Sequence, residues 1–221
     1  GRDLVIAADG GLAPARVLGV EPDLVVGDFD SVEASDLRRY EHVPVERHPP
    51  EKDDLDLELA LSAAWERGAD HANVAGAFGD RLDQSFGALL IAARLVASGR
   101  SLALFAANHE ARVVAAGGSS VRELHPGTTV SLLALAEDCV VSTSGVHYPL
   151  REAALPMGTG LGLSNAATGG PVELAVHAGV VALLVEHPPD EPKQAIWGAQ
   201  AERISAALAA ADPDLGALVE R

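Results

Sequence analysis

The pattern of apolar residues changes near Gly117-Gly118, and this change restricts the chain to two kinds of sheet. Before it, short apolar runs alternate with segments that repeat apolar residues at helical spacing, namely residues 55–67 and 82–98. Alternating strands and helices are typical of a parallel sheet covered by helices. After it, apolar runs follow one another closely and are separated by turns of glycine, proline and serine. Such closely spaced strands predict a β-sandwich.

The apolar runs also predict where the strands lie and divide the chain into three parts. The expected strands are residues 4–8, 24–26, 73–75, 102–106 and 112–115, then 129–135, 140–143, 172–176 and 180–185. Residues 1–118 predict an α/β domain with a mainly parallel sheet, and residues 119–190 predict an all-β sandwich domain. Residues 191–221 predict a helical tail, because an alanine-rich segment precedes Pro213.

One segment has two interpretations. Residues 55–59 alternate apolar and acidic side chains, which is the pattern of a half-buried strand. Apolar residues continue at helical spacing through Leu61 and Trp65, and Gly68 follows as a typical end of a helix. We therefore expect a helix.

The composition excludes several classes of partner. The chain has 32 acidic and 16 basic residues, which gives a net charge of −16. This charge repels phosphate backbones and anionic lipids, so we expect neither nucleic acid nor a membrane as partner. No apolar run approaches the roughly 20 residues that cross a bilayer. A single cysteine, Cys139, excludes an internal disulfide and favours a cytoplasmic location.

Acidic residues gather where the expected strands end. Asp9 follows the first strand, Asp28 and Asp30 follow the second, and Asp56 ends an acidic loop. Ligands of open parallel sheets bind beyond the carboxyl ends of the strands, so we expect these carboxylates to converge. Converging carboxylates repel one another unless a cation lies among them, and such oxygen ligands suit Mg²⁺. Alone, each acid is more often a cap or turn residue, and Asp54 keeps that interpretation.

Two basic residues stand beside these acids in the sequence. Lys52 lies in the acidic loop, and Arg81 lies at the start of a predicted helix, where phosphate oxygens could be bound. The sequence contains neither GxxxxGK[ST] nor GxGxxG. The two familiar phosphate-binding loops are therefore excluded.

Six motifs in order resemble the thiamine pyrophosphokinase family. They are ADGG at 8–11, PDLVVGDFDS at 22–31, HPPEKDDLDLELA at 48–60, GDRLDQ at 79–84, GVHYPL at 145–150 and GLSN at 162–165. The resemblance spans roughly residues 7–185. It departs from the family at Leu55, Asp80 and Ala166, where the family has threonine, glycine and often glutamate.

This resemblance implies a reaction and a set of site residues. The family transfers the pyrophosphoryl group of ATP to the hydroxyl of thiamine and releases AMP, and its members are homodimers of an α/β domain and a β-sandwich. The implied catalytic residues and Mg²⁺ ligands are Asp28, Asp30 and Asp56. The implied nucleotide-binding residues are Asp9, Gly10, Lys52, Arg81, Asp83 and Gln84. The implied thiamine-binding residues are Tyr148, Ser164 and Asn165, in a pocket shared between subunits.

Two other functions stay open at this point. Leu55 and Asp80 motivate a related pyrophosphokinase acting on another heteroaromatic alcohol, such as a hydroxymethyl pterin. The third hypothesis is a thiamine or nucleotide sensor without turnover, against which the retained carboxylates argue. Tyr148 also has a structural interpretation, as a half-buried strand residue of the sandwich.

Overall fold

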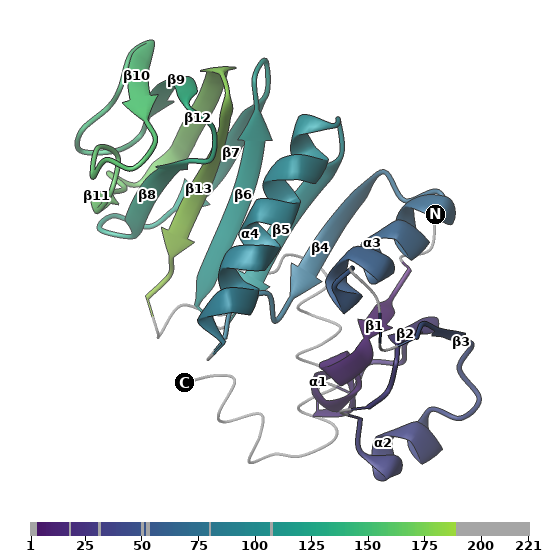
Figure 1. Cartoon of the computed structure of the whole chain (residues 1–221). Coiled ribbons are helices and arrows are strands. Elements are labelled where there is room, and N and C mark those ends of the chain that lie inside the picture. The colour runs from purple at the N-terminus through teal and green to yellow at the C-terminus, as the bar shows by residue number, and fades with distance from the viewer. Residues whose placement is uncertain are drawn as a thin grey trace. The chain divides into compact units, whose positions relative to one another are not determined.

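The computed structural model describes residues 4–188, except Leu18, Ser31, Pro50, Lys52, Asp53, Asp80 and Ala107. Lys52, Asp80 and the predicted tail therefore lie outside the described residues. The chain divides into two compact units, which meet in the sequence between Asp70 and His71 (Figure 1). Among the described helices, none has the length and apolar character needed to cross a bilayer.

The first unit contains a three-stranded parallel sheet. Its strands, in the order β1-β2-β3, are β1 (Ile6–Ala8), β2 (Leu24–Gly27) and β3 (Val45–Arg47). The other elements are η1 (Asp9–Gly11), α1 (Leu12–Val17), α2 (Ala34–Arg39) and α3 (Asp56–Glu66).

Strand β2 is buried on both faces, and this fixes the carboxyl ends of the sheet. Val25 packs into one apolar cluster with Leu12 and Phe29, whereas Val26 packs into another with Ala63 of α3. Successive side chains of a strand point to opposite faces of the sheet. Because β2 contains no polar residue, it contributes side chains to the apolar clusters on both faces. The residues that follow β2 therefore leave a rigid strand end.

The second unit contains two sheets and one long helix. The six-stranded sheet has the order β11-β8-β13-β6-β5-β4, and the four-stranded sheet has the order β10-β9-β12-β7. The strands of the first sheet are β4 (His71–Ala75), β5 (Ser101–Ala106), β6 (His109–Ala115), β8 (Thr129–Ala134), β11 (Asn165–Ala166) and β13 (Val180–Glu186). Those of the second are β7 (Ser119–Leu124), β9 (Asp138–Ser144), β10 (Ala153–Pro156) and β12 (Gly170–Ala178). Helix α4 (Leu82–Ala97) packs on β5, β6 and β13 (Figure 1).

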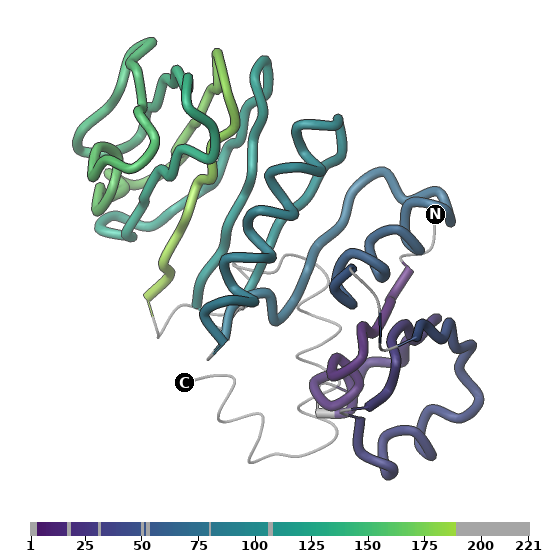
Figure 2. The backbone as a smooth tube through the Cα atoms, in the orientation of Figure 1, coloured from purple at the N-terminus to yellow at the C-terminus, as the bar shows by residue number. Residues whose placement is uncertain are grey.

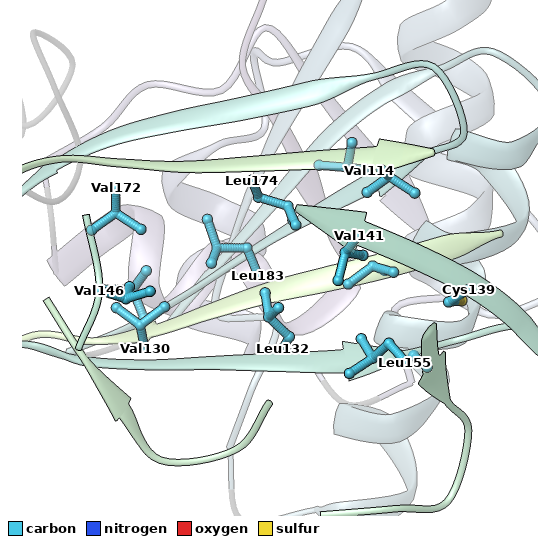
Figure 3. Close-up of a cluster of buried hydrophobic side chains, with 14 of the residues drawn as sticks. Val114, Val130, Leu132, Cys139, Val141, Val146, Leu155, Val172, Leu174 and Leu183 are labelled. Atoms are coloured by element: carbon cyan, nitrogen blue, oxygen red, sulfur yellow. The ribbon is translucent and has the colours of Figure 1, made fainter. Parts of the chain in front are cut away.

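The main core of this unit draws on both of its sheets. Leu132 and Leu183 come from the six-stranded sheet, Val141 and Leu174 come from the four-stranded sheet, and all four belong to one buried cluster (Figure 3). The backbone trace shows how β13, near the end of the described chain, returns to lie beside β6 (Figure 2). Segments far apart in the sequence thus build this core.

The coarse fold prediction is confirmed: a parallel sheet comes first, and mostly antiparallel strands follow. The predicted helices at 55–67 and 82–98 are confirmed as α3 and α4. The run at 112–115, which we expected in the parallel sheet, instead belongs to β6, which pairs antiparallel with β5. β5 ends at Ala106 and β6 begins at His109. So short a connection cannot form the crossover that parallel neighbours need.

The two compact units do not meet at the domain boundary predicted from the sequence. The six-stranded sheet joins β4 and β5 to strands of the second half, so the second unit already begins at His71. The boundary expected between residues 118 and 119 lies between β6 and β7, within this unit. This boundary stays a prediction of where the nucleotide-binding part of the chain ends and the thiamine-binding part begins.

Candidate functional site

Three carboxylates come together at the end of the parallel sheet. Asp9 directly follows β1, and Asp28 and Asp30 follow β2. One carboxylate oxygen from each lies within 4.8 Å of the others. Because β1 and β2 are parallel neighbours, their carboxyl ends meet at one edge. Three oxygen ligands at this spacing could hold a divalent cation.

Backbone hydrogen bonds hold two of these carboxylates in place. The side chain of Asp9 is buried, and its Oδ1 accepts a hydrogen bond of 3.1 Å from the N–H of Phe29. Oδ1 of Asp28 accepts a hydrogen bond of 3.2 Å from the N–H of Asp30. Gly27 permits the approach, because a Cβ there would lie only 3.0 Å from Cβ of Asp9. The backbone therefore positions the carboxylates before any ligand binds.

The carboxylates of the cluster repel one another. The charge of Asp28 raises the pKa of Asp30 above its usual value, and partial desolvation and the charges of Asp9 and Asp56 act in the same direction. Like charges that share a site disfavour ionisation of both. A bound cation would remove this penalty, so the electrostatics and the geometry favour the same occupant.

Asp56 lies outside the group of three carboxylates but acts on it. It is the first residue of α3, and its charge contributes to the raised pKa of Asp30. The preceding Leu55 occupies the N-cap without a side-chain cap hydrogen bond. A threonine, the family's residue there, could supply that bond. The family resemblance implied Asp56 as a metal ligand and Asp9 as a nucleotide-binding residue, whereas the structure groups Asp9 with Asp28 and Asp30.

The start of α4, in the second unit, presents another charged group. Arg81 is the N-cap of the helix, and its Nη2 lies 2.6 Å from Oδ2 of Asp83 in an exposed ion pair. The hydrogen bond from Arg81 lowers the pKa of Asp83, and the same bond raises the pKa of Arg81. Gln84 is exposed on the first turn. Gly10, in the first unit, has open space where a Cβ would lie.

The predicted thiamine-side residues lie around a small cavity of the second unit. Tyr148 is 76% exposed in the loop after β9, so its interpretation as a half-buried strand residue is wrong. Its backbone N–H donates to Oδ1 of Asn165 at 3.1 Å, and its carbonyl accepts from Nδ2 at 2.9 Å. The amide of Asn165 thus holds the backbone of Tyr148 at two points.

The cavity itself is apolar and small, about 90 Å³. Tyr148, Asn165 and Thr143 line it, together with aliphatic residues that include Leu161 and Leu163. Ser164 has a φ of 55°, and its N–H donates to Oγ of Ser131 at 3.0 Å. The structure thus brings Tyr148 and Asn165 together at the cavity, and Ser164 shapes the turn between its neighbours.

Sequence comparison identifies relatives of both halves. Residues 1–104 match a family model described as thiamin pyrophosphokinase, catalytic domain, and residues 120–181 match thiamin pyrophosphokinase, vitamin B1 binding domain. The predicted boundary near residue 119 falls between the two matched segments. Thiamine pyrophosphokinase of Bacillus subtilis is 27% identical over 165 residues, and the match covers 73% of this chain and 77% of the relative.

Solved structures give the same relationship. A thiamine pyrophosphokinase from Bacillus subtilis superposes with a TM-score of 0.75 at 25% identity, covering 83% of this chain and 87% of that one. One from Geobacillus thermodenitrificans gives 0.72 at 25% identity, covering 85% and 88%. The enzyme from Candida albicans, at 15% identity and a TM-score of 0.70, shares the fold over 83% and 82%. The two models of this family match the chain in order and together cover more than half of the chain's length. This chain therefore belongs to the thiamin pyrophosphokinase family.

Proposed function

We propose that this chain is an ATP-dependent thiamine pyrophosphokinase, which transfers the pyrophosphoryl group of ATP to the hydroxyl of thiamine and releases AMP. The match to both family models supports the reaction. The observation that carries the proposal is the carboxylate cluster at the ends of β1 and β2. It lies in the segment that matches the catalytic model, where this chemistry needs a cation.

We assign Asp9, Asp28 and Asp30 as the ligands of Mg²⁺. Their oxygens have the chemistry and spacing that this ion prefers, and the raised pKa of Asp30 reflects a charge excess that a cation would relieve. When bound, Mg²⁺ neutralises phosphate charge and aligns the phosphates for attack. The buried Asp9 and the two backbone hydrogen bonds keep the oxygens in place, so little reorganisation is needed.

Asp56 fits a different task, which is to orient the thiamine hydroxyl or accept its proton. It is close enough to influence Asp30 but lies outside the group of three. A carboxylate beside the metal ligands is placed to contact the attacking oxygen. Asp56→Asn should then lower kcat and leave metal binding intact. Weaker metal binding in this variant would make Asp56 a ligand instead.

The nucleotide-binding assignments are Gly10, Lys52, Arg81, Asp83 and Gln84. Arg81 stands at the N-terminus of a helix of 16 residues, where phosphate oxygens are favoured. Its guanidinium has several donors, so it can contact phosphate while Asp83 fixes its orientation. Asp83 thus acts through Arg81.

The thiamine-binding assignments are Tyr148, Ser164 and Asn165. The exposed ring of Tyr148 can stack on an aromatic heterocycle or lie against a cationic one. The cavity beside it holds about 90 Å³, well below the roughly 300 Å³ of small ligand pockets. From the family resemblance, we further propose a homodimer in which a second copy of the chain completes the pocket. We also propose a cytoplasmic enzyme in which the strands after residue 118 form the thiamine-binding sandwich.

The proposal is tested by incubating the purified chain with ATP, Mg²⁺ and either thiamine or a hydroxymethyl pterin. We expect AMP and thiamine diphosphate with thiamine alone, detected by chromatography and mass spectrometry. AMP release only with the pterin would contradict the substrate. Thiamine binding without AMP would indicate a sensor, and both results would refute the proposed function.

A further inference from the structure

The loop of the carboxylate site contains one residue in an unusual conformation. Phe29 lies between Asp28 and Asp30, and its φ of 68° is in the left-handed region. Bulky side chains rarely adopt that region, because Cβ crowds the backbone. The ring of Phe29 is only 7% exposed and packs in the cluster with Leu12 and Val25. A buried side chain thus anchors a backbone conformation that would otherwise relax.

This conformation determines how the carboxylates face one another. The N–H of Phe29 points to Oδ1 of Asp9, and with Phe29 in the left-handed region the next N–H points to Oδ1 of Asp28. Rotation of the backbone at Phe29 would break the second hydrogen bond and turn Asp30 away from Asp28, because the N–H of Asp30 follows Phe29 in the chain. The ring therefore controls the geometry of the site without contacting a ligand.

An exposed basic residue restrains the ring from outside. Arg47 ends β3, and its guanidinium carbon lies 4.7 Å from the centroid of the Phe29 ring. Arg47 pairs in register with Gly27, at the base of the loop. Both Phe29 and Arg47 line a cavity of about 180 Å³ that Tyr40 and Val45 also border. On that side the ring borders this cavity, and the guanidinium of Arg47 packs against the ring there.

We propose that Phe29 and Arg47 are positioning residues, which hold Asp28 and Asp30 in the arrangement that binds the divalent cation. The inference rests on the proposed function for the identity of the metal site. It adds the role of Arg47, which comes from a strand outside the motifs that carry the family resemblance.

The charge of Arg47 separates this role from plain electrostatics. If the guanidinium acted only through its charge, a neutral residue in its place would remove a repulsion, and the cation would bind more tightly. If it holds the ring of Phe29, the same change loosens the loop, and the cation binds more weakly. The two explanations predict opposite signs for one variant.

The test measures binding of Mn²⁺ alone to the full chain, with free Mn²⁺ followed by electron paramagnetic resonance. For Arg47→Gln we expect the dissociation constant to rise about 2- to 5-fold, the range of an exposed cation–π contact. Arg47→Lys keeps the charge but loses the planar stack, and we expect a smaller rise. Phe29→Leu keeps an apolar anchor without a stacking face, and we expect a rise at least as large as that of Arg47→Gln.

Arg39→Gln is the matched control. The Arg39 guanidinium lies 5.7 Å from the ring of Tyr40, which belongs to the same apolar cluster as Phe29 but not to the metal loop. We expect Mn²⁺ binding of this variant to equal that of the parent. An equal weakening in Arg39→Gln would overturn the proposal, since general loosening of the cluster would explain both results. Unchanged or tighter binding in Arg47→Gln would also overturn it.

The metal measurement does not depend on the identity of the substrate. If the parent binds no Mn²⁺, the metal site and this inference both fail. If Mn²⁺ binding responds as expected but no AMP forms with thiamine, the proposed function fails and the positioning role stands.

Discussion

The carboxylate site of the first unit and the tyrosine site of the second are held in place in different ways. Asp9 and Asp28 stand directly at the ends of paired strands, and β2 is buried along its whole length. Tyr148 stands on an exposed loop, where the amide of Asn165 holds its backbone at both N–H and carbonyl. Strand pairing and a core fix the first site, whereas one side chain fixes the second.

This difference determines how each site should respond to substitution. In the first site, a carboxylate can be changed to an amide without disturbing the strands. We therefore expect such a change to reduce activity and to leave the fold intact. In the second, removal of the Asn165 amide can move Tyr148, the residue proposed to contact thiamine. Substitutions at the first site should therefore lower kcat. Substitutions at the second site should instead raise the KM for thiamine.

The largest expected effect is that of Asp28→Asn. Loss of a metal ligand should lower AMP formation on the order of 10²-fold or more, because charge neutralisation at the transferred phosphates is lost. The melting temperature should not fall, since one of several repelling charges is removed. The matched control is Asp54→Asn, at an exposed acid outside the cluster, which should keep parental activity. Activity of Asp28→Asn within about 3-fold of the parent would contradict the assignment.

Tyr148→Ala should raise the KM for thiamine about 5- to 30-fold, which corresponds to roughly 1–2 kcal/mol for a lost stacking partner. The KM for ATP should stay unchanged, and so should the melting temperature, because the ring is exposed. Steady-state kinetics with each substrate varied in turn gives both constants. If stability falls while both constants stay constant, Tyr148 has a packing role instead.

Asn165→Ala sharpens the same comparison. It removes two hydrogen bonds that fix Tyr148, so we expect the KM for thiamine to rise about 5- to 10-fold, or about 1 kcal/mol. Added to Tyr148→Ala, it should have little further effect, because it acts through that ring. Asn108→Ala is the control: this amide also donates to a backbone carbonyl, that of His187, at 3.1 Å. A full additive effect in the double variant would show that Asn165 contacts thiamine directly.

Arg81→Ala should raise the KM for ATP by about 10-fold, since a charge-assisted contact to phosphate is worth about 1.5 kcal/mol. Arg81→Lys keeps the charge but not the fork of donors, so its KM should lie between those of the alanine variant and the parent. The KM for thiamine should be the same in all three proteins. A larger change for thiamine than for ATP would remove Arg81 from the nucleotide side.

The smallest effect concerns the stability of the metal-free protein. The raised pKa of Asp30 means that the folded state holds this proton more tightly than the unfolded state, whose ordinary pKa is 3.8. Stability is therefore lost as the pH rises from that value through the raised pKa. Asp30→Asn should reduce this loss and raise the melting temperature at pH 7 by on the order of 1 °C. Thermal scans in EDTA from pH 3 to pH 8 measure it, and a lower melting temperature at pH 7 would contradict the repulsion.

The sequence indicates the first candidate site more directly than the second, because the strand ends are visible in it. Apolar runs that stop at Asp9 and Asp28 already indicate acids at one edge of a sheet. The grouping of Asp9 with Asp30, ahead of Asp56, depends on positive φ angles at Asp9 and Phe29, which no spacing rule reveals. β3 was not predicted, since it has only three residues and two of them are exposed. The sequence therefore provided no reason to consider Arg47, for which we propose a positioning role.

The second site shows what pattern reasoning cannot reach. The exposure of Tyr148 depends on the loop after β9, and that loop depends on hydrogen bonds to Asn165, which is 17 residues away. Only the motif suggested that these residues act together. β6 is a different case, since the short connection after Ala106 already favoured an antiparallel pair.

The most direct test of the central claim is a crystal structure of the chain with Mn²⁺ and a non-hydrolysable ATP analogue, with the metal located by anomalous scattering. We predict an anomalous peak about 2.0–2.3 Å from one oxygen each of Asp9, Asp28 and Asp30, the range of metal–oxygen bonds. The analogue's phosphates should complete the coordination, and Asp56 should lie outside it. A peak elsewhere on the molecule, or full analogue occupancy with no metal among these three carboxylates, would contradict it.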